Sequence, residues 1–332
     1  MHGVKRSRLT AQAAEAKRQK EEAKIQTYVS LQQDVLARRK ERDYSEEALA
    51  KTTELLDLNP EFYTIWNYRR NILLNGLFPA STPEDIVKLL TTDLRLTTAY
   101  LQVHPKVYWI WNHRKWCLES VPPGPDDSEG WRNQFWKMEL MLIEKMLDAD
   151  ARNFHAWDYR RYVLRSLPDS YTPPRTAQDE LKYTQKKIEA NFSNFSAWHC
   201  RTKILGGLWE GQSPETIARE KDSEFELVRQ ALWTDPGDQS GWLYHRWLVG
   251  NEPEEGVLRR ELESTRELHE TEPDSKWCMG ALAHYTLILS RLNTTAPEES
   301  DKLRADAKQL LDRLAVIDPD RKERYRDFVK QI

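Results

Sequence analysis

The segment "HPKVYWIWNHRKW" (residues 104–116) decides the fold, because the chain carries five versions of its Trp-centred pattern. A near-copy is "NPEFYTIWNYRR" (59–70), and looser copies are "DARNFHAWDYRR" (150–161), "NFSNFSAWHCR" (191–201) and "DPGDQSGWLYHRW" (235–247). The central tryptophans Trp66, Trp111, Trp157, Trp198 and Trp242 recur at intervals of 45, 46, 41 and 44 residues. Such a period holds two helices and their loops, and repeated helical hairpins stack on one another. We therefore predict an all-α fold, a crescent-shaped α-α superhelix (solenoid) of about seven helical hairpins.

Sequence signals mark both ends of the first helix in each predicted hairpin. Thr82 is expected to cap a helix that has Pro83 at its first position and Asp85 closing a capping box. Because a proline disfavours the α conformation of the residue before it, an Xaa-Pro pair marks a helix end. Five such pairs are expected to end first helices: Asn59-Pro60, His104-Pro105, Asp235-Pro236, Glu272-Pro273 and Asp318-Pro319.

We predict one helical-repeat domain over residues 1–332. It begins with an arm and a charged helix (1–41) whose narrow apolar stripe consists of Ile25, Tyr28, Val29 and Leu36. Six hairpins (42–292) and a terminal hairpin (293–332) follow. The Trp-bearing units are placed at 59–75, 104–120, 150–166, 191–206, 235–250 and 272–291.

An arginine three residues after the tryptophan shares its helix face in four copies. The indole is expected to fill the space between adjacent hairpins, while the guanidinium bridges to a carboxylate or loop carbonyl of the next one. The four pairs are Trp66 and Arg69, Trp111 and Arg114, Trp157 and Arg160, and Trp198 and Arg201. The fifth copy, Trp242, has His245 at the third position and Arg246 at the fourth, so its bridge is expected to be re-aimed.

Composition excludes several classes of function. A net charge of −3 gives no global attraction to nucleic acid or membrane. The chain has no run of 18 apolar residues and no signal-peptide pattern, so we expect a cytoplasmic protein without a membrane span. Three cysteines far apart in sequence predict neither a disulfide framework nor a self-contained zinc site. No hydrolase, metalloprotease, P-loop or dinucleotide fingerprint is present.

The five Trp-centred segments resemble the repeats of protein prenyltransferase α subunits, and the resemblance covers nearly the whole chain. It implies a crescent of hairpins wrapped around a β subunit, which holds the zinc and the isoprenoid pocket. The chain is then one part of an enzyme and is not active alone. A missing cysteine cluster agrees with this, because alkylation of a thiol requires a metal-activated thiolate.

Within this family the chain is most similar to the α subunits of Rab geranylgeranyltransferase (type II), in a compact form without immunoglobulin-like and leucine-rich-repeat modules. The similarity rests on the "MHG" start, the closing repeats from "SKWCMGALAHYTLIL" onward, and Trp109. The α subunit of farnesyltransferase and type I geranylgeranyltransferase has a glutamine at this place, which holds a CaaX carboxylate. The resemblance implies transfer of geranylgeranyl from geranylgeranyl diphosphate to C-terminal cysteines of Rab GTPases that an escort protein presents.

The resemblance also implies roles for individual residues. Lys106 and Tyr108 match the family's diphosphate-facing pair, and an ammonium there would stabilise the negative charge that grows on the leaving diphosphate. Phe154 corresponds to Tyr108 one repeat later and lacks the hydroxyl, and the neighbouring His155 is expected at the subunit junction. His2 is expected to contact the zinc of the β subunit in the resting enzyme.

Two alternatives remain open. One is the α subunit of farnesyltransferase or type I geranylgeranyltransferase, against which Trp109 and the "MHG" start argue. The other is a non-catalytic helical-repeat scaffold, which the repeat spacing and the Lys106-x-Tyr108 pair disfavour.

Overall fold

The structure, a computed structural model, describes residues 10–125, 129–292 and 294–332, and these contain helices and connecting segments but no strand. The all-α prediction is therefore confirmed. Contacts divide the chain into two compact units, Met1–Pro174 (unit one) and Arg175–Ile332 (unit two). The single domain and the crescent shape stay predictions.

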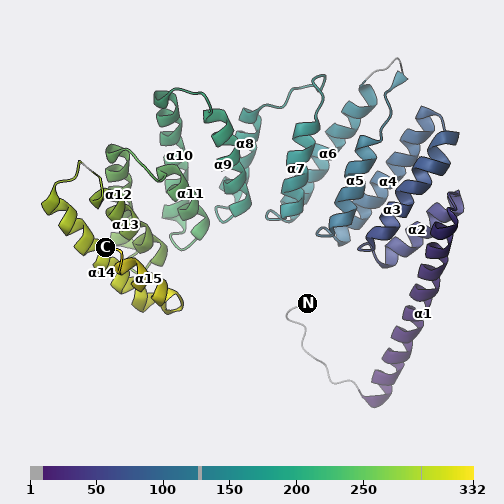
Figure 1. Cartoon of the computed structure of the whole chain (residues 1–332), viewed down its shortest axis with the longest axis horizontal. Coiled ribbons are helices and arrows are strands. Elements are labelled where there is room, and N and C mark those ends of the chain that lie inside the picture. Colours follow the sequence, from purple (N-terminus) through teal and green to yellow (C-terminus); the bar gives the residue numbers. More distant parts are fainter. Residues whose placement is uncertain (1–9, 126–128, 293) are drawn as a thin grey trace. The chain divides into compact units, whose positions relative to one another are not determined.

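Unit one consists of a long helix, α1 (Ala11–Glu41), followed by three hairpins. The hairpins are α2 (Glu46–Leu58) with α3 (Tyr63–Ile72), α4 (Pro83–Val103) with α5 (Tyr108–Glu119), and α6 (Gly130–Ala149) with α7 (Phe154–Ser166). The second helices of consecutive hairpins contact one another, α3 with α5 and α5 with α7 (Figure 1).

Unit two contains four hairpins in its described residues. They are α8 (Ala177–Ala190) with α9 (Phe195–Trp209), α10 (Pro214–Thr234) with α11 (Gln239–Val249), α12 (Glu255–Thr271) with α13 (Lys276–Ser290), and α14 (Pro297–Ile317) with α15 (Lys322–Val329). Helix α11 contacts both α9 and α13. The described chain thus has the seven hairpins that the repeat spacing predicts.

The predicted helix boundaries are confirmed at the Xaa-Pro pairs. Asn59, His104, Asp235, Glu272 and Asp318 are each the C-cap of a first helix. Thr82 caps α4 and accepts from the amide of Asp85, with Pro83 as the first helical residue. A complete capping box forms at Thr176 and Asp179.

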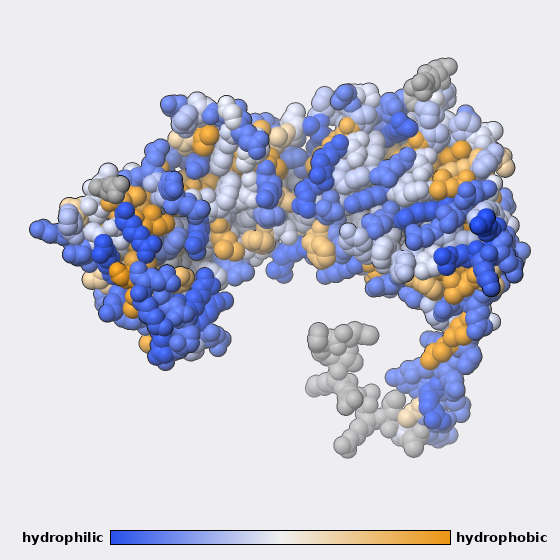
Figure 2. Space-filling model, in the orientation of Figure 1, coloured by the Kyte–Doolittle hydropathy of each residue, from blue (hydrophilic) through white to orange (hydrophobic). Residues whose placement is uncertain are grey.

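The stripe predicted on α1 packs only near the C-terminal end of the helix. Ile25 is 59% exposed and Val29 is 36% exposed, whereas Val35, which was not assigned to the stripe, is fully buried. The reason is geometric: α1 extends beyond the first hairpin, and its projecting part shows hydrophobic residues to solvent (Figures 1 and 2).

Buried arginines join consecutive hairpins. Each guanidinium makes a bidentate pair of hydrogen bonds to a carboxylate on the first helix of the next hairpin. The three pairs are Arg69 with Asp93 (2.6 and 2.9 Å), Arg114 with Glu139 (2.6 and 2.6 Å), and Arg201 with Glu224 (2.6 and 2.6 Å). Paired N–H···O bonds of this kind fix both the distance and the orientation of the two helices.

The same guanidinium also binds the first helix of its own hairpin. Nη1 of Arg114 donates to the carbonyl of Leu94 (2.7 Å) and the hydroxyl of Thr97 (2.9 Å). Arg69 and Arg201 make the corresponding bonds, to Leu49 and Thr52 and to Leu181 and Thr184. One side chain therefore connects three helices.

In three of the five copies, the residue two places after the tryptophan (His113, Tyr159 or Tyr244) binds the bridging carboxylate. The hydroxyl of Tyr159 donates to Glu139 (2.8 Å), and Nε2 of His113 lies 2.8 Å from Asp93. Arg69 and His113 lower the pKa of Asp93 although burial opposes this, and burial lowers the pKa of His113 to about 4. His113 is therefore neutral at pH 7.

In the fifth copy the bridge belongs to His245 and not to Arg246. His245 is buried, with Nε2 3.0 Å from Glu261 and Nδ1 2.6 Å from the hydroxyl of Tyr285, whereas Arg246 is exposed. The assignment of Arg246 to the structural set is thus corrected. The third position after the tryptophan faces the next hairpin, and the fourth does not.

The indoles take a constant position in all five copies. Each Nε1 donates to the backbone carbonyl six residues earlier, at 2.8–3.0 Å. In three copies the ring also packs against the next hairpin, with centroid distances of 4.7 Å for Trp66 and His113, 4.9 Å for Trp111 and Tyr159, and 4.5 Å for Trp198 and Tyr244. Every tryptophan therefore fixes its own interhelix turn, and these three also contact the neighbouring repeat.

We expect Arg114→Ala to lower the free energy of unfolding by about 3–5 kcal/mol, because Glu139 would remain buried without its counter-charge. The measurement is urea denaturation followed by circular dichroism. Arg18→Ala is the control, since Arg18 forms an exposed pair with Glu15, and its loss should cost at most about 0.5 kcal/mol. Equal losses in the two variants would contradict the role of the bridge.

Stability should fall on acidification in part because of His113. The pKa of His113 is about 4 in the folded protein, against an ordinary value of 6.5. Between pH 6.5 and pH 4, His113 is therefore protonated in the unfolded chain and neutral in the folded one, so the folded state loses stability relative to the unfolded state as the pH falls. Denaturation at pH 7 and pH 5 should therefore show a loss of about 2 kcal/mol from this residue. His113→Gln should lose that much less than the wild type over the same interval. Parallel pH profiles would refute this origin.

Candidate functional site

The turn that carries Lys106 is held between two hairpins. It closes through a bond from the amide of Val107 to the carbonyl of His104 (3.2 Å), and α5 begins at the next residue. The carbonyl of Pro105 accepts from Nε1 of Trp111 (3.0 Å) and from Nδ2 of Asn153 (3.2 Å). Anchors from both hairpins hold the backbone of Lys106 in place.

Asn153 serves both hairpins at once. Its side chain is buried and caps α7, with Oδ1 accepting from the amides of His155 (3.0 Å) and Ala156 (3.3 Å). Since its Nδ2 holds Pro105, the start of α7 and the Lys106 turn are fixed relative to each other.

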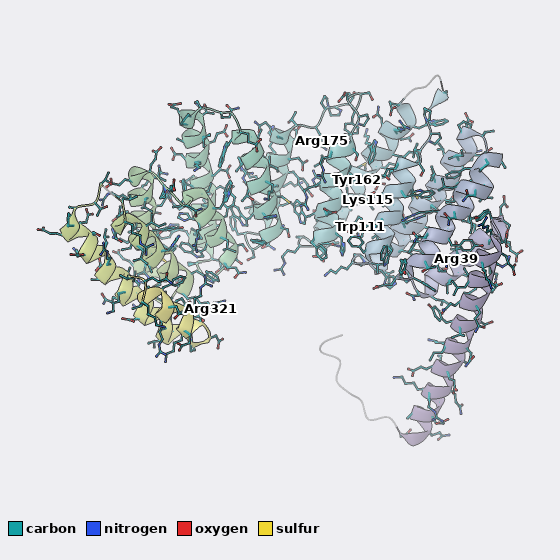
Figure 3. All side chains as sticks on the ribbon, viewed as in Figure 1. Arg39, Trp111, Lys115, Tyr162, Arg175 and Arg321 are labelled. Atoms are coloured by element: carbon teal, nitrogen blue, oxygen red, sulfur yellow. The ribbon has the colours of Figure 1, made fainter. Side chains whose placement is uncertain are left out.

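The ammonium of Lys106 is available to an anion. The side chain is 66% exposed, and its Nζ lies 3.5 Å from Oδ2 of Asp150, the residue that ends α6. Exposed ion pairs contribute at most about 1 kcal/mol, so a multiply charged anion can replace Asp150. Lys115 on α5 differs: its Nζ lies 4.9 Å from the centre of the Tyr162 ring and 3.5 Å from Asp158 (Figure 3).

Tyr108 and His155 lie beside Lys106. The half-buried His155 ring hydrogen-bonds the backbone of Lys106, and its centre is 5.6 Å from that of Tyr108. Burial lowers the pKa of His155, with a further contribution from the charge of Lys106. The structure thus brings three of the sequence-predicted site residues together.

Exposed aromatic side chains surround this group at the N-terminal ends of α3, α5 and α7. This aromatic cluster consists of Tyr63 (53% exposed), Tyr108 (58%), Trp109 (36%) and Phe154 (65%). The rings of Tyr63 and Trp109 are 5.1 Å apart, and those of Tyr108 and Trp109 are 6.0 Å apart. Aromatic groups gathered on a surface are typical of protein interfaces.

One buried group of potential metal ligands does not fit a metal ion. Atoms of Asp93, His113 and Cys117 lie within 4.8 Å of one another. However, Asp93 is already bound by Arg69 and His113, and burial raises the pKa of the Cys117 thiol well above its usual range. The group is a structural bridge with its counter-charge in place, and it offers neither a thiolate nor a free carboxylate.

The structure bears on the expectations for the cysteines, for a membrane span and for His2. The cysteines 117, 200 and 278 are buried and form no disulfide, as the sequence predicts. Among the described residues, no helix has the length and apolar character needed to cross a bilayer. His2 lies outside the described residues.

Sequence reasoning missed Asp150 and Asn153. Both contact the Lys106 turn from the following hairpin, so no local motif links them to it. Comparing equivalent positions of the repeats could have identified both residues. Asp150 follows a first helix as His104 does, and Asn153 precedes a second helix as Val107 does.

The chain matches a known repeat family and proteins related over its whole length. Five segments match the protein prenyltransferase alpha subunit repeat, at residues 45–76, 90–121, 136–167, 177–208 and 221–252. The geranylgeranyl transferase type-2 subunit alpha of Schizosaccharomyces pombe is 40% identical over 352 residues, covering 100% of this chain and 98% of that protein. The protein of that name in Dictyostelium discoideum is 35% identical and covers 100% of both chains.

A solved structure shares the fold. The Candida albicans protein geranylgeranyltransferase-I complexed with GGPP contains a chain that superposes with a TM-score of 0.67, at 22% identity. The match covers 92% of this chain and 90% of that one. The helical-hairpin architecture is therefore that of a known prenyltransferase chain.

Proposed function

The chain belongs to the family of geranylgeranyl transferase type-2 alpha subunits, and from this we propose that it is the α subunit of a heterodimeric Rab geranylgeranyltransferase. The observation that carries the proposal is similarity over the entire chain to relatives of that name. In this proposal the chain works in the cytoplasm and is inactive without a β subunit.

The proposed reaction joins a Rab cysteine to an isoprenoid. The C–O bond of geranylgeranyl diphosphate breaks, diphosphate leaves with the electron pair, and a C–S bond forms to a C-terminal cysteine of a Rab GTPase presented by an escort protein. Zinc held by the β subunit would supply the activated thiolate. The chemistry of Asp93, His113 and Cys117 supports placing the metal on the partner, because none of them is free to ligate it.

The contribution of this chain is stabilisation of the leaving group. Lys106 presents an exposed ammonium from a turn anchored through Pro105, so little reorganisation is needed when an anion arrives. Negative charge on the diphosphate increases as the C–O bond breaks, so this ammonium stabilises the transition state more than the bound substrate. In this proposal the hydroxyl of Tyr108 donates an additional hydrogen bond to the diphosphate.

The aromatic cluster is proposed to meet the β subunit. It is exposed in this chain and surrounds Lys106, so a partner that covers it would also exclude water from the ammonium. His155 would lie in that junction, and His2 would contact the zinc of the β subunit in the resting enzyme. A drier environment strengthens the attraction between Lys106 and diphosphate.

The proposed function is tested by co-expression with a type-2 β subunit. We expect a one-to-one complex that transfers geranylgeranyl to Rab only when an escort protein is present, and no transfer by this chain alone. The measurement is incorporation of labelled isoprenoid. Activity on a free CaaX peptide without escort-dependent Rab activity would instead identify a farnesyltransferase or type I subunit. Failure to form any complex would leave the scaffold interpretation.

Within that complex, Lys106→Ala should lower kcat by roughly 10–10³-fold, because it removes a charge aimed at the leaving group. The heterodimer should remain assembled on size-exclusion chromatography. Lys88→Ala is the matched control, since Lys88 is an exposed lysine paired with Asp85 on α4, outside the site. Unchanged turnover in Lys106→Ala would refute the assignment.

A further inference from the structure

Unit two contains an open groove that the proposed chemistry does not use. Its cavity of about 540 Å³ lies between α11, α13 and α15. Helix α13 lines it from Lys276 to Arg291 at the helix end, a distance of about 22 Å at 1.5 Å per residue. We call it the α13 groove.

The groove has an apolar lining that solvent can reach. Leu311 and Leu314 of α14 contribute to its wall, and Leu243 (43% exposed) and Phe328 (39% exposed) line it from α11 and α15. Gly280 lies on the groove side of α13, where a Cβ would meet no heavy atom within 4 Å. The space above α13 is therefore open for another apolar side chain.

The charged residues that line the groove are all basic. They are Arg246, Lys276, Arg291, Arg321 and Arg324, and the lining includes neither aspartate nor glutamate. Asp318, outside the lining, lies 2.9 Å from Arg321 and 3.7 Å from Lys276. Within the described residues no carboxylate forms an ion pair with the other three arginines. This local excess of positive charge contrasts with the net charge of −3 of the chain.

The pKa of His284 indicates the same positive environment. It faces the groove, and its pKa falls to about 4 through burial and the charges of Arg246 and Arg291. An anion bound between these two arginines would offset the repulsion that they exert on a protonated His284.

The distribution of the charges indicates the kind of ligand. Arg246 comes from α11, Lys276 and Arg291 from opposite ends of α13, and Arg321 and Arg324 from the α15 side, where Figure 3 shows Arg321. A single-headed amphiphile such as an isoprenoid diphosphate carries its charge at one end and would leave several of these cations unmatched. A polypeptide with acidic side chains along its length, flanking apolar ones, matches both the charges and the apolar wall.

We propose that the α13 groove docks an acidic amphipathic segment of the β subunit. Its apolar side chains lie over Gly280 against α14, and its carboxylates face Arg246, Arg291 and Arg324. The groove length corresponds to about four turns of helix, the usual scale of helix-in-groove recognition. This inference rests on the proposed function, since it names where the partner of that enzyme binds.

The amino-terminal segment of the chain itself is a poor occupant. Residues 1–9, "MHGVKRSRL", carry three basic side chains and no acidic one. They would add positive charge to a groove that already lacks negative charge.

The test measures the affinity of the full chain for the β subunit. Gly280→Trp fills the groove, and Arg246→Glu/Arg291→Glu reverses its charge. Each should weaken the heterodimer at least about tenfold, and the charge reversal should also reduce the salt dependence of binding. A photo-cross-linking side chain at position 280 should attach to a β-subunit peptide that has more acidic than basic residues.

Matched controls make the same changes outside the groove. Gly256→Trp is placed on α12, where a Cβ also meets nothing within 4 Å. Arg219→Glu/Lys308→Glu repeats the charge change on the exposed surfaces of α10 and α14. These variants should bind like the wild type, and circular dichroism checks that all variants are folded.

The outcomes separate this inference from the proposed function. If the wild type forms an active heterodimer and the folded groove variants bind within twofold of it, the inference is wrong and the proposed function stands. If they bind β normally but lose binding of a fluorescent isoprenoid diphosphate, the occupant is an amphiphile. If variants change only self-association, it is a second copy of this chain. If the wild type binds no β subunit, both the proposed function and the inference about the groove are wrong.

Discussion

The two-pronged arginine–carboxylate bridge is the constraint on which the stacked hairpins depend. Arg114 contacts Thr97 seventeen residues before it and Glu139 twenty-five residues after it, so it connects the first helices of two hairpins. Taking such charges out of water is costly, and the cost is offset only when all their hydrogen bonds are made. The hairpin length is therefore restricted, which explains why the tryptophans recur so regularly.

The position of the Lys106 turn is a consequence of this packing. The side chain of Asn153 binds the carbonyl of Pro105 because the next second helix must be capped at that junction, and Ser275 binds Pro236 in the same way in unit two. What distinguishes the copy at Pro105 is the side chain that follows the proline. Here it is Lys106, whose ammonium projects from a backbone already fixed for structural reasons, so its proposed catalytic role needs no additional scaffold.

Local sequence signals were enough to predict the helices and their ends, whereas contacts between residues far apart in sequence could not be predicted. Helix ends followed from proline chemistry and from caps such as Thr82, which act within a few residues. The partners Asp150 and Asn153 depend on which residues the next hairpin presents, and no local pattern records that. The exposure of Ile25 shows the same limit, because an apolar stripe indicates a face but not how far its partner extends. The role proposed for Lys106 rests on family resemblance, since an isolated lysine in a turn specifies no chemistry.

The charges of this chain divide into two kinds according to whether they have counter-charges. Inside the hairpins, Arg69, Arg114 and Arg201 each face a carboxylate, because a buried charge without one would destabilise the fold. On the surface, Lys106 has only a weak partner, and Arg246 and Arg291 in the α13 groove repel protonation of His284. Solvent screens these cations in the isolated chain, so they cost little until something covers them. A covering partner or substrate must then bring the negative charge, which makes these positions selective for anionic ligands.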